Sequence, residues 1–308
     1  YIYNGNVGNW IKFANTLRLR LAMRISYVDQ TKAETEAKAA IDHSIGLMTS
    51  VSDNAVLKQS VSFSFINEWW EAYESFNDFR MSATMDCYLK GLQDPRLAAY
   101  FKVAKKDGEY HGVRNGQTSR SQGTLSEAAS SMNVGQASSI LWMDAAETYF
   151  LLAEAKLRLN LGDKTVKEYY EEGVKTSFSS KGASGAESYL DNDVNVPSIS
   201  FIDPTNGRNT DVSRMVSNLT VKWDESVSDD KKLERIMVQK WIALFPDGQE
   251  AWSEMRRTGY PGIVTINTNA SGGEVATGEL ISRLKFPTKE YSDNGENTQA
   301  AVSGAKWP

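Results

Sequence analysis

The feature that most constrains the fold of this chain is a pair of adjacent helical patterns between residues 139 and 179. In SILWMDAAETYFLLAEAKLRLNLGD, apolar side chains recur at the spacing of one helical face. That face consists of Leu141, Ala145, Tyr149, Leu152 and Leu159. Leu161-Gly162-Asp163 ends the pattern, and Asp163 is expected to cap a second helix. The face of the second helix consists of Val166, Tyr169, Tyr170, Val174 and Phe178. A turn this short predicts a helical hairpin.

A second hairpin is predicted near residues 8–48. In NWIKFANTLRLRLAMRISYV, an apolar stripe indicates an amphipathic helix whose lysine and arginines project elsewhere. The stripe consists of Trp10, Phe13, Leu17, Leu21 and Val28. Thr31 followed by Glu34 predicts a capping box for the next helix. The small-residue face of that helix, which permits close packing, consists of Ala33, Ala37, Ala40, Ile41 and Ile45.

A third hairpin is predicted near residues 228–258. Its first helix carries Leu233, Met237 and Trp241 on one face, and the corner Pro246-Asp247-Gly248 separates it from a short helix that Gly259 ends. We expect Trp241 and Trp252 to clamp this hairpin, and Arg256 and Arg257 to hold acidic groups or carbonyls at the helix end.

Between the hairpins the chain loses its helical period and gains glycine, serine and asparagine. Loop-rich insertions are therefore expected near 105–138, 180–227 and 260–308, the last with short strands at 262–267 and 280–286. The predicted fold class is mainly α, as a single domain over 1–308. Tetratricopeptide-like helical hairpins would form its framework, with an irregular loop-rich subdomain beside them.

Composition excludes several classes of function. The net charge of −5 argues against a nucleic-acid partner, because such proteins carry a basic surface. Two histidines cannot supply a multi-histidine metal site, and neither a nucleophile elbow nor a phosphate loop occurs. Asp191, Asp193 and Asn195 match only the opening of a calcium loop. We predict no cofactor, no metal and no catalytic residue.

One aromatic cluster is a candidate binding site. FINEWWEAYESFNDFRM is expected to form a helix with Trp69, Tyr73, Phe76 and Arg80 one turn apart and Trp70 beside that stripe. Trp69, Trp70 and Tyr73 offer flat apolar faces to a sugar or other ligand. The alternative is that the stripe is buried in the core, with Trp70 the residue most expected to stay outside it.

Six segments, taken in order, resemble the SusD/RagB family of nutrient-binding outer-membrane lipoproteins of Bacteroidetes. They are NWIKFANTLRLRLAMRIS, DPRLAAYF, AETYFLLAEAKLRLNLGD, YYEEGVKTSF, QKWIALFPDGQEAWSEMRRTGYP and RLKFPTKEYSDNGEN. The resemblance implies a helical scaffold at the cell surface. It also implies capture of a glycan, or in some relatives a peptide, and delivery to a TonB-dependent, SusC-like transporter without catalysis. Family members begin with a lipid-modified cysteine and a further segment, and we expect this chain to lack both that anchor and that segment.

Two other functions stay open at this point. A helical-repeat scaffold for protein interactions would need no small ligand, because stacked hairpins offer extended surfaces. A helical glycoside hydrolase would need two carboxylates facing each other across a cleft, about 5 to 9.5 Å apart.

Overall fold

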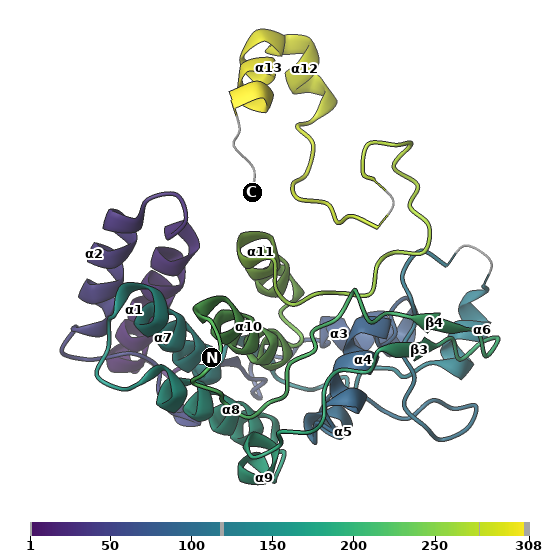
Figure 1. Cartoon of the computed structure of the whole chain (residues 1–308), viewed down its shortest axis with the longest axis horizontal. Coiled ribbons are helices and arrows are strands. Elements are labelled where there is room, and N and C mark those ends of the chain that lie inside the picture. The colour runs from purple at the N-terminus through teal and green to yellow at the C-terminus, as the bar shows by residue number, and fades with distance from the viewer. Residues whose placement is uncertain (1, 118–119, 277, 305–308) are drawn as a thin grey trace.

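The computed structural model describes residues 2–117, 120–276 and 278–304, and the chain is mainly helical (Figure 1). The longer helices are α1 (Val7–Ile25), α2 (Gln30–Ile41), α4 (Ala83–Gly91), α7 (Ala145–Leu159), α8 (Val166–Lys181), α10 (Asp229–Leu244), α11 (Gly248–Thr258) and α13 (Gly295–Gly304). The shorter ones are α3 (Glu68–Trp70), α5 (Arg96–Tyr100), α6 (Gln122–Ala128), α9 (Ala186–Leu190) and α12 (Thr288–Asp293), with a 3-10 turn, η1 (Val51–Asp53), and a π-helical turn, η2 (Glu71–Ser75).

Two small antiparallel sheets accompany the helices. In the first, β1 (Ala55–Leu57) pairs with β2 (Ile140–Met143), and in the second β3 (Ser200–Ile202) pairs with β4 (Asn209–Asp211). The predicted helix at 139 therefore begins later, because residues 140–143 are a strand. Asp144 accepts a hydrogen bond from the backbone N–H of Ala146 (3.0 Å) and so starts α7.

The two helices of the α7–α8 hairpin pack closely at Gly173. A Cβ on Gly173 would lie 2.8 Å from the ring of Phe150, so only glycine lets these helices approach so closely. The cap of α8 is Thr165, which forms a capping box with Glu168, and the prediction of Asp163 as this cap is wrong. Asp163 is instead engaged as the acceptor for the Tyr169 hydroxyl (2.7 Å).

The α1–α2 hairpin corrects the predicted apolar stripe. Leu19, Ala22 and Met23 form the buried face of α1, whereas Leu21 and Val28 are exposed. Asp29, which accepts from the backbone N–H of Lys32, caps α2 in place of the predicted Thr31–Glu34 box. The predicted alanine face of α2 is confirmed, since Ala33, Ala37 and Ala40 are fully buried, but the helix ends at Ile41 and leaves Ile45 exposed.

Buried charges explain why α1 turns a different face inward. Arg20 on α1 makes two hydrogen bonds to Glu147 on α7, and Arg24 contacts both Glu250 and Glu254 on α11. These pairs belong to a group that we call the ion-pair seam, which joins α1, α7, α10 and α11. The ion-pair seam consists of Arg20, Arg24, Glu147, Glu154, Lys240, Glu250, Glu254 and Arg257.

The other side of the molecule is built from short elements. Figure 1 shows α1, α2, α7 and α8 on one side and α4, α5, α6 and the β3–β4 sheet on the other, with α10 between them. A buried pair, Arg96 and Asp94, ties the two sides together through Ser177 on α8 and Gln239 on α10. One connected apolar core spans both sides.

The regions predicted as loop-rich contain α6, α9, α12 and α13 as well as β3 and β4. Residues 262–267 and 280–286 are all described, and neither range forms a strand. In the first range, single hydrogen bonds to a helix and a loop replace a ladder: Val264 donates to the Thr84 hydroxyl on α4 (3.0 Å) and Asn267 to the Asn115 carbonyl (2.8 Å). In the described part of the chain, none of the helices combines the length and apolarity that crossing a bilayer requires.

Candidate functional site

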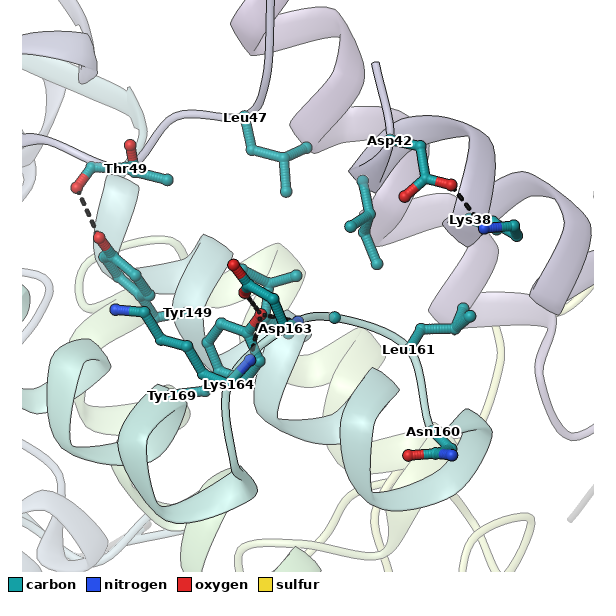
Figure 2. A pocket seen from close by; sticks show the side chains of 13 residues that line it. Lys38, Asp42, Leu47, Thr49, Tyr149, Asn160, Leu161, Asp163, Lys164 and Tyr169 are labelled. Atoms are coloured by element: carbon teal, nitrogen blue, oxygen red, sulfur yellow. Dashed lines mark hydrogen bonds and ion pairs between the residues drawn. The ribbon is translucent and has the colours of Figure 1, made fainter. Parts of the chain in front are cut away.

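One pocket, of about 670 Å³, lies between α2 and the α7–α8 turn (Figure 2). Several of its polar groups are engaged within the chain. The Tyr149 hydroxyl donates to the Thr49 carbonyl (2.9 Å), the Tyr169 hydroxyl donates to Asp163, and Lys38 pairs with an aspartate one turn away on α2. This pocket is therefore a junction between two hairpins, and its tyrosine hydroxyls already donate within the chain.

A second pocket, of about 250 Å³, has the composition that a ligand site requires. We call it the aromatic pocket. Its lining consists of Trp69, Tyr73, Arg80, Met81, Ser82, Met85, Phe101, Trp241, Phe245, Pro246, Asp247, Gly248 and Ala251. Two of the three residues predicted from the sequence, Trp69 and Tyr73, belong to this lining. Trp70 is half-buried on the same short helix but is not part of the lining.

The short helix α3 holds Trp69 in place through its cap. Asn67, which is almost fully buried, accepts hydrogen bonds from the backbone N–H groups of Trp69 (2.9 Å) and Trp70 (3.2 Å). Its side-chain amide also donates to the carbonyl of Ser138 (3.1 Å), so α3 is fixed to a distant loop. The indole N–H groups of Trp69 and Trp70 have no hydrogen-bond partner among the described residues.

The helix predicted across 65–81 is interrupted, which corrects the predicted stripe. After α3 the chain widens into the π-helical turn η2, and Asn77 then adopts a left-handed conformation with φ of 58°. Arg80 lies outside any helix and donates to the Tyr73 carbonyl (3.1 Å) and to the Asn77 side chain (2.8 Å). Wide helical turns and left-handed non-glycine residues concentrate at functional sites.

The opposite wall comes from the last hairpin. Trp241 on α10 packs against Tyr88 of α4, with ring centroids 5.4 Å apart, and Phe245 stacks on Tyr100 and Phe101. The sequence predicts Trp241 only as part of a structural clamp with Trp252. Trp252 instead donates its indole N–H to the Ile281 carbonyl (3.0 Å), so the two indoles make separate contacts.

The arginines that follow Trp252 behave as predicted. Arg257 binds Glu154 and Glu254, and Arg256 donates to the Ser282 carbonyl (2.8 Å) and lies 3.8 Å from the Trp252 ring. The motif at 241–261 therefore has two roles, because its first helix and corner line the aromatic pocket while its second helix joins the ion-pair seam.

Burial shifts the pKa values of two side chains in the aromatic pocket. Burial raises the pKa of Tyr73 to about 12, so this side chain stays a neutral phenol. Burial also lowers the pKa of Arg80, whose buried Nε has no hydrogen-bond partner. Asp247 is the one carboxylate among the described residues of the lining, and it caps α11 by accepting from Glu250 N–H (3.1 Å). That lining lacks the paired carboxylates that glycoside hydrolysis uses.

The described residues do not support a metal site, a calcium loop or a reactive cysteine. They contain no group of three or more histidine, cysteine or acidic side chains able to hold a metal ion. Asp193 of the partial calcium motif pairs with Lys222 (3.2 Å). Cys87 is buried, and burial raises the pKa of its thiol to about 12, which leaves it protonated and unreactive.

Comparison with known proteins identifies the relatives of this fold. The family model described as "SusD-like: Susd and RagB outer membrane lipoprotein" matches residues 1–306. The chain belongs to the SusD-like family. The resemblance found in the sequence is thereby confirmed, as is the mainly helical SusD-like fold.

Solved SusD homologues superpose closely on this SusD-like chain. A chitin-binding SusD homologue from Flavobacterium johnsoniae is 39% identical, with a TM-score of 0.89, over 99% of this chain and 62% of the homologue. A SusD homologue from Bacteroides uniformis is 38% identical, with a TM-score of 0.88, over 98% of this chain and 63% of the homologue. The SusD-like chain thus spans about three fifths of the length of these relatives. Among curated proteins, the comparison found no match.

Proposed function

We propose that this SusD-like protein binds a glycan in the aromatic pocket at the cell surface and delivers it, unaltered, to a TonB-dependent, SusC-like transporter in the outer membrane. The observation that carries the proposal is the position of Trp69, which lines the pocket with an indole N–H that has no partner among the described residues. Aromatic faces contact the C–H faces of sugars, and free N–H groups donate to their hydroxyls.

Trp69, Trp70 and Tyr73 are the proposed ligand-binding residues. Tyr73 would form the buried base of the site and Trp69 its wall, while Trp70 would extend the aromatic surface beyond the pocket. The kinship to a chitin-binding homologue supports a glycan as the ligand and makes chitin fragments the first compounds to test. An oligopeptide is the second candidate ligand, because the pocket is mainly apolar.

Calorimetric titration of the purified protein with chito-, cello-, manno- and malto-oligosaccharides, and with a peptide mixture, tests this proposal. We expect saturable binding of one glycan series without change in its chain length. In a folded Trp69→Ala variant, affinity should fall by about 1 to 3 kcal/mol, the range of a buried aromatic contact. Tyr291, an exposed tyrosine on α12, supplies the matched control as Tyr291→Ala, which should bind like the unchanged protein.

Three results would contradict the proposal. Cleavage of the bound glycan by the purified protein would show that the protein is an enzyme. Absence of binding to every glycan and peptide would favour the alternative function, a helical scaffold that holds proteins together and has no small ligand. Unchanged affinity in Trp69→Ala would show that the ligand does not bind in the aromatic pocket. The delivery step is tested separately, by co-purification with the SusC-like transporter from outer membranes.

A further inference from the structure

Arg80, which lines the aromatic pocket, forms no ion pair with any described residue. A guanidinium has five N–H donors. Nη1 of Arg80 donates to the carbonyls of Tyr73 (3.1 Å) and Phe79 (2.5 Å), and Nη2 donates to the side-chain oxygen of Asn77 (2.8 Å). These acceptors are all uncharged, and the buried Nε–H has no partner among the described residues. Arg80 thus lacks the carboxylate that a partly buried guanidinium usually has.

The carboxylates nearest in effect to Arg80 are engaged with other cations. Burial lowers the pKa of Arg80, and Glu74 and Glu127 counteract that effect only in part. Glu74 pairs with Lys102 (3.0 Å), and Glu127 lies 3.8 Å from Lys105. Each of these carboxylates therefore has its own lysine, and neither neutralises Arg80.

Asp247, the one carboxylate among the described residues of the pocket lining, is compensated on the opposite wall. It accepts from Glu250 N–H (3.1 Å) at the start of α11, where the helix dipole favours a negative charge. Burial opposes the charge of Arg20, but Glu147, Glu250 and Asp247 outweigh it and raise the pKa of Arg20. Asp247 thus lies in a positive environment of its own, whereas the charge of Arg80 faces the pocket uncompensated.

Two neutral donors accompany this cation. The indole N–H of Trp69 and the hydroxyl of Tyr73 have no hydrogen-bond partner among the described residues. Such donors suit the hydroxyl groups of any sugar, whereas a guanidinium selects for an anionic group. The pocket volume of about 250 Å³ is below the roughly 300 to 1,000 Å³ of most ligand sites, so it suits a single sugar unit.

From the unpaired charge of Arg80 we propose that the sugar unit held in the aromatic pocket carries a carboxylate, as a uronic acid does. The inference rests on the proposed function, and it adds the chemical class of the glycan. The carboxylate accepts a charge-assisted hydrogen bond from the Arg80 guanidinium while the sugar ring packs against Trp69. One carboxylate carries one negative charge, which matches the single unpaired guanidinium. The protein therefore prefers an acidic glycan to a neutral one of the same linkage.

Calorimetric titration of the intact chain with two matched pairs of trisaccharides tests this inference. Cellotriose is compared with β-1,4-triglucuronate, and β-1,4-mannotriose with β-1,4-trimannuronate. The members of each pair differ only in the carboxylate that replaces the hydroxymethyl group. We expect the acidic member of the preferred pair to bind at least about tenfold more tightly, the effect of one hydrogen bond to a charged group. This advantage should shrink as salt rises from about 0.05 to 0.5 M, because ions screen the attraction.

Three arginine variants locate the effect. Arg80→Gln removes the charge and should abolish the acidic advantage, and any loosening of the loop affects both members of a pair and cancels from their ratio. Arg80→Lys keeps the charge and should retain part of the advantage. Arg114→Gln is the matched control, because Arg114 also binds uncharged groups, the carbonyl and hydroxyl of Thr265, and lies outside the pocket lining. It should retain all of the advantage.

Each outcome distinguishes this inference from the function on which it rests. Equal affinity for both members of each pair, or an acidic advantage that survives in folded Arg80→Gln, overturns the inference. An advantage that stays unchanged at high salt also overturns it, and that measurement needs no variant. An equal loss in Arg114→Gln would show a general effect of protein charge and would overturn it too. The proposed function then stands if Trp69→Ala still weakens saccharide binding. If no saccharide binds the unchanged protein, the proposed function itself fails.

Discussion

The ion-pair seam and the aromatic pocket share the α10–α11 hairpin and treat their polar groups in opposite ways. In the seam, Glu154 is fully buried and accepts hydrogen bonds from Arg257 and Arg158, which come from different helices. In the pocket, Trp69 is only half-buried, and its indole N–H has no partner among the described residues. The seam pairs its carboxylates internally, although the buried Nε of Arg24 has no partner among the described residues, whereas the pocket keeps an indole N–H available to a ligand.

This difference separates what holds the fold together from what can bind. A buried charge that loses its partner strongly destabilises a protein, so the seam should tolerate little change. A half-exposed indole contributes less to stability and can change with the ligand. Variants should therefore divide into those that unfold the chain and those that only weaken binding.

The largest expected effect is on the seam. Arg257→Met removes the partner that Glu154 and Glu254 share and leaves them paired with Arg158 and Lys240, and we expect the free energy of unfolding to fall by about 3 kcal/mol. Urea denaturation followed by circular dichroism measures this loss. A loss below about 1 kcal/mol would show that the seam is as dispensable as a surface ion pair.

A smaller loss is expected at acid pH. Burial opposes the ionisation of Glu254, but Lys240, Arg257 and Arg24 outweigh it and hold the pKa of Glu254 below its usual range. The stability that Glu254 contributes is therefore present above about pH 4.5 and declines as the pH falls toward the lowered pKa. Urea denaturation between about pH 3 and 7 should show this decline. In Glu254→Gln the decline should be shallower; a curve of unchanged steepness would contradict the assignment.

Asn67 holds the helix that carries Trp69, so its loss should affect both stability and binding. Asn67→Ala removes the cap of α3 and should cost about 0.5 to 2 kcal/mol of stability. Glycan affinity should also fall, although Asn67 is not in the pocket lining, because Trp69 loses its fixed position. Asn67→Ser keeps a capping oxygen without adding a charge and should restore part of the affinity, although it loses the amide that donates to the Ser138 carbonyl. Equal binding by the asparagine and alanine forms would show that α3 needs no cap.

The smallest effect is expected at an exposed ion pair. Arg18 on α1 and Glu36 on α2 lie 2.6 Å apart at the surface. Arg18→Met, which makes the same exchange as Arg257→Met, should change the free energy of unfolding by about 0 to 1 kcal/mol, and less at high salt. The difference between the stability losses of Arg257→Met and Arg18→Met measures how much burial adds to the contribution of an ion pair.

The sequence predicted the helical hairpins because periodicity and short turns are local signals. The α7–α8 pair shows this, and so does the corner at Asp247. Which side of each helix is buried was predicted less well. Arg20 points inward because it finds Glu147, which is 127 residues away, and no local pattern reports such a partner.

The aromatic site was predicted only in part, because some of its residues come together through contacts that are distant in the sequence. Trp69, Trp70 and Tyr73 stood out by their density, but Trp241 was expected only as a structural clamp. Its position in the pocket wall depends on how α10 packs against α4. The π-helical turn η2 was also missed, because a wide turn leaves no signature in the spacing of aromatic residues.

The segment after α11 is attached to that helix through main-chain oxygens. Trp252 and Arg256 both reach main-chain oxygens, at Ile281 and Ser282, and touch no side-chain polar group there. Carbonyl oxygens are common to all amino acids, so this attachment does not depend on which residues stand at positions 281 and 282. Mutations can therefore accumulate in that stretch without detaching it, provided that the indole and the guanidinium on α11 stay in place.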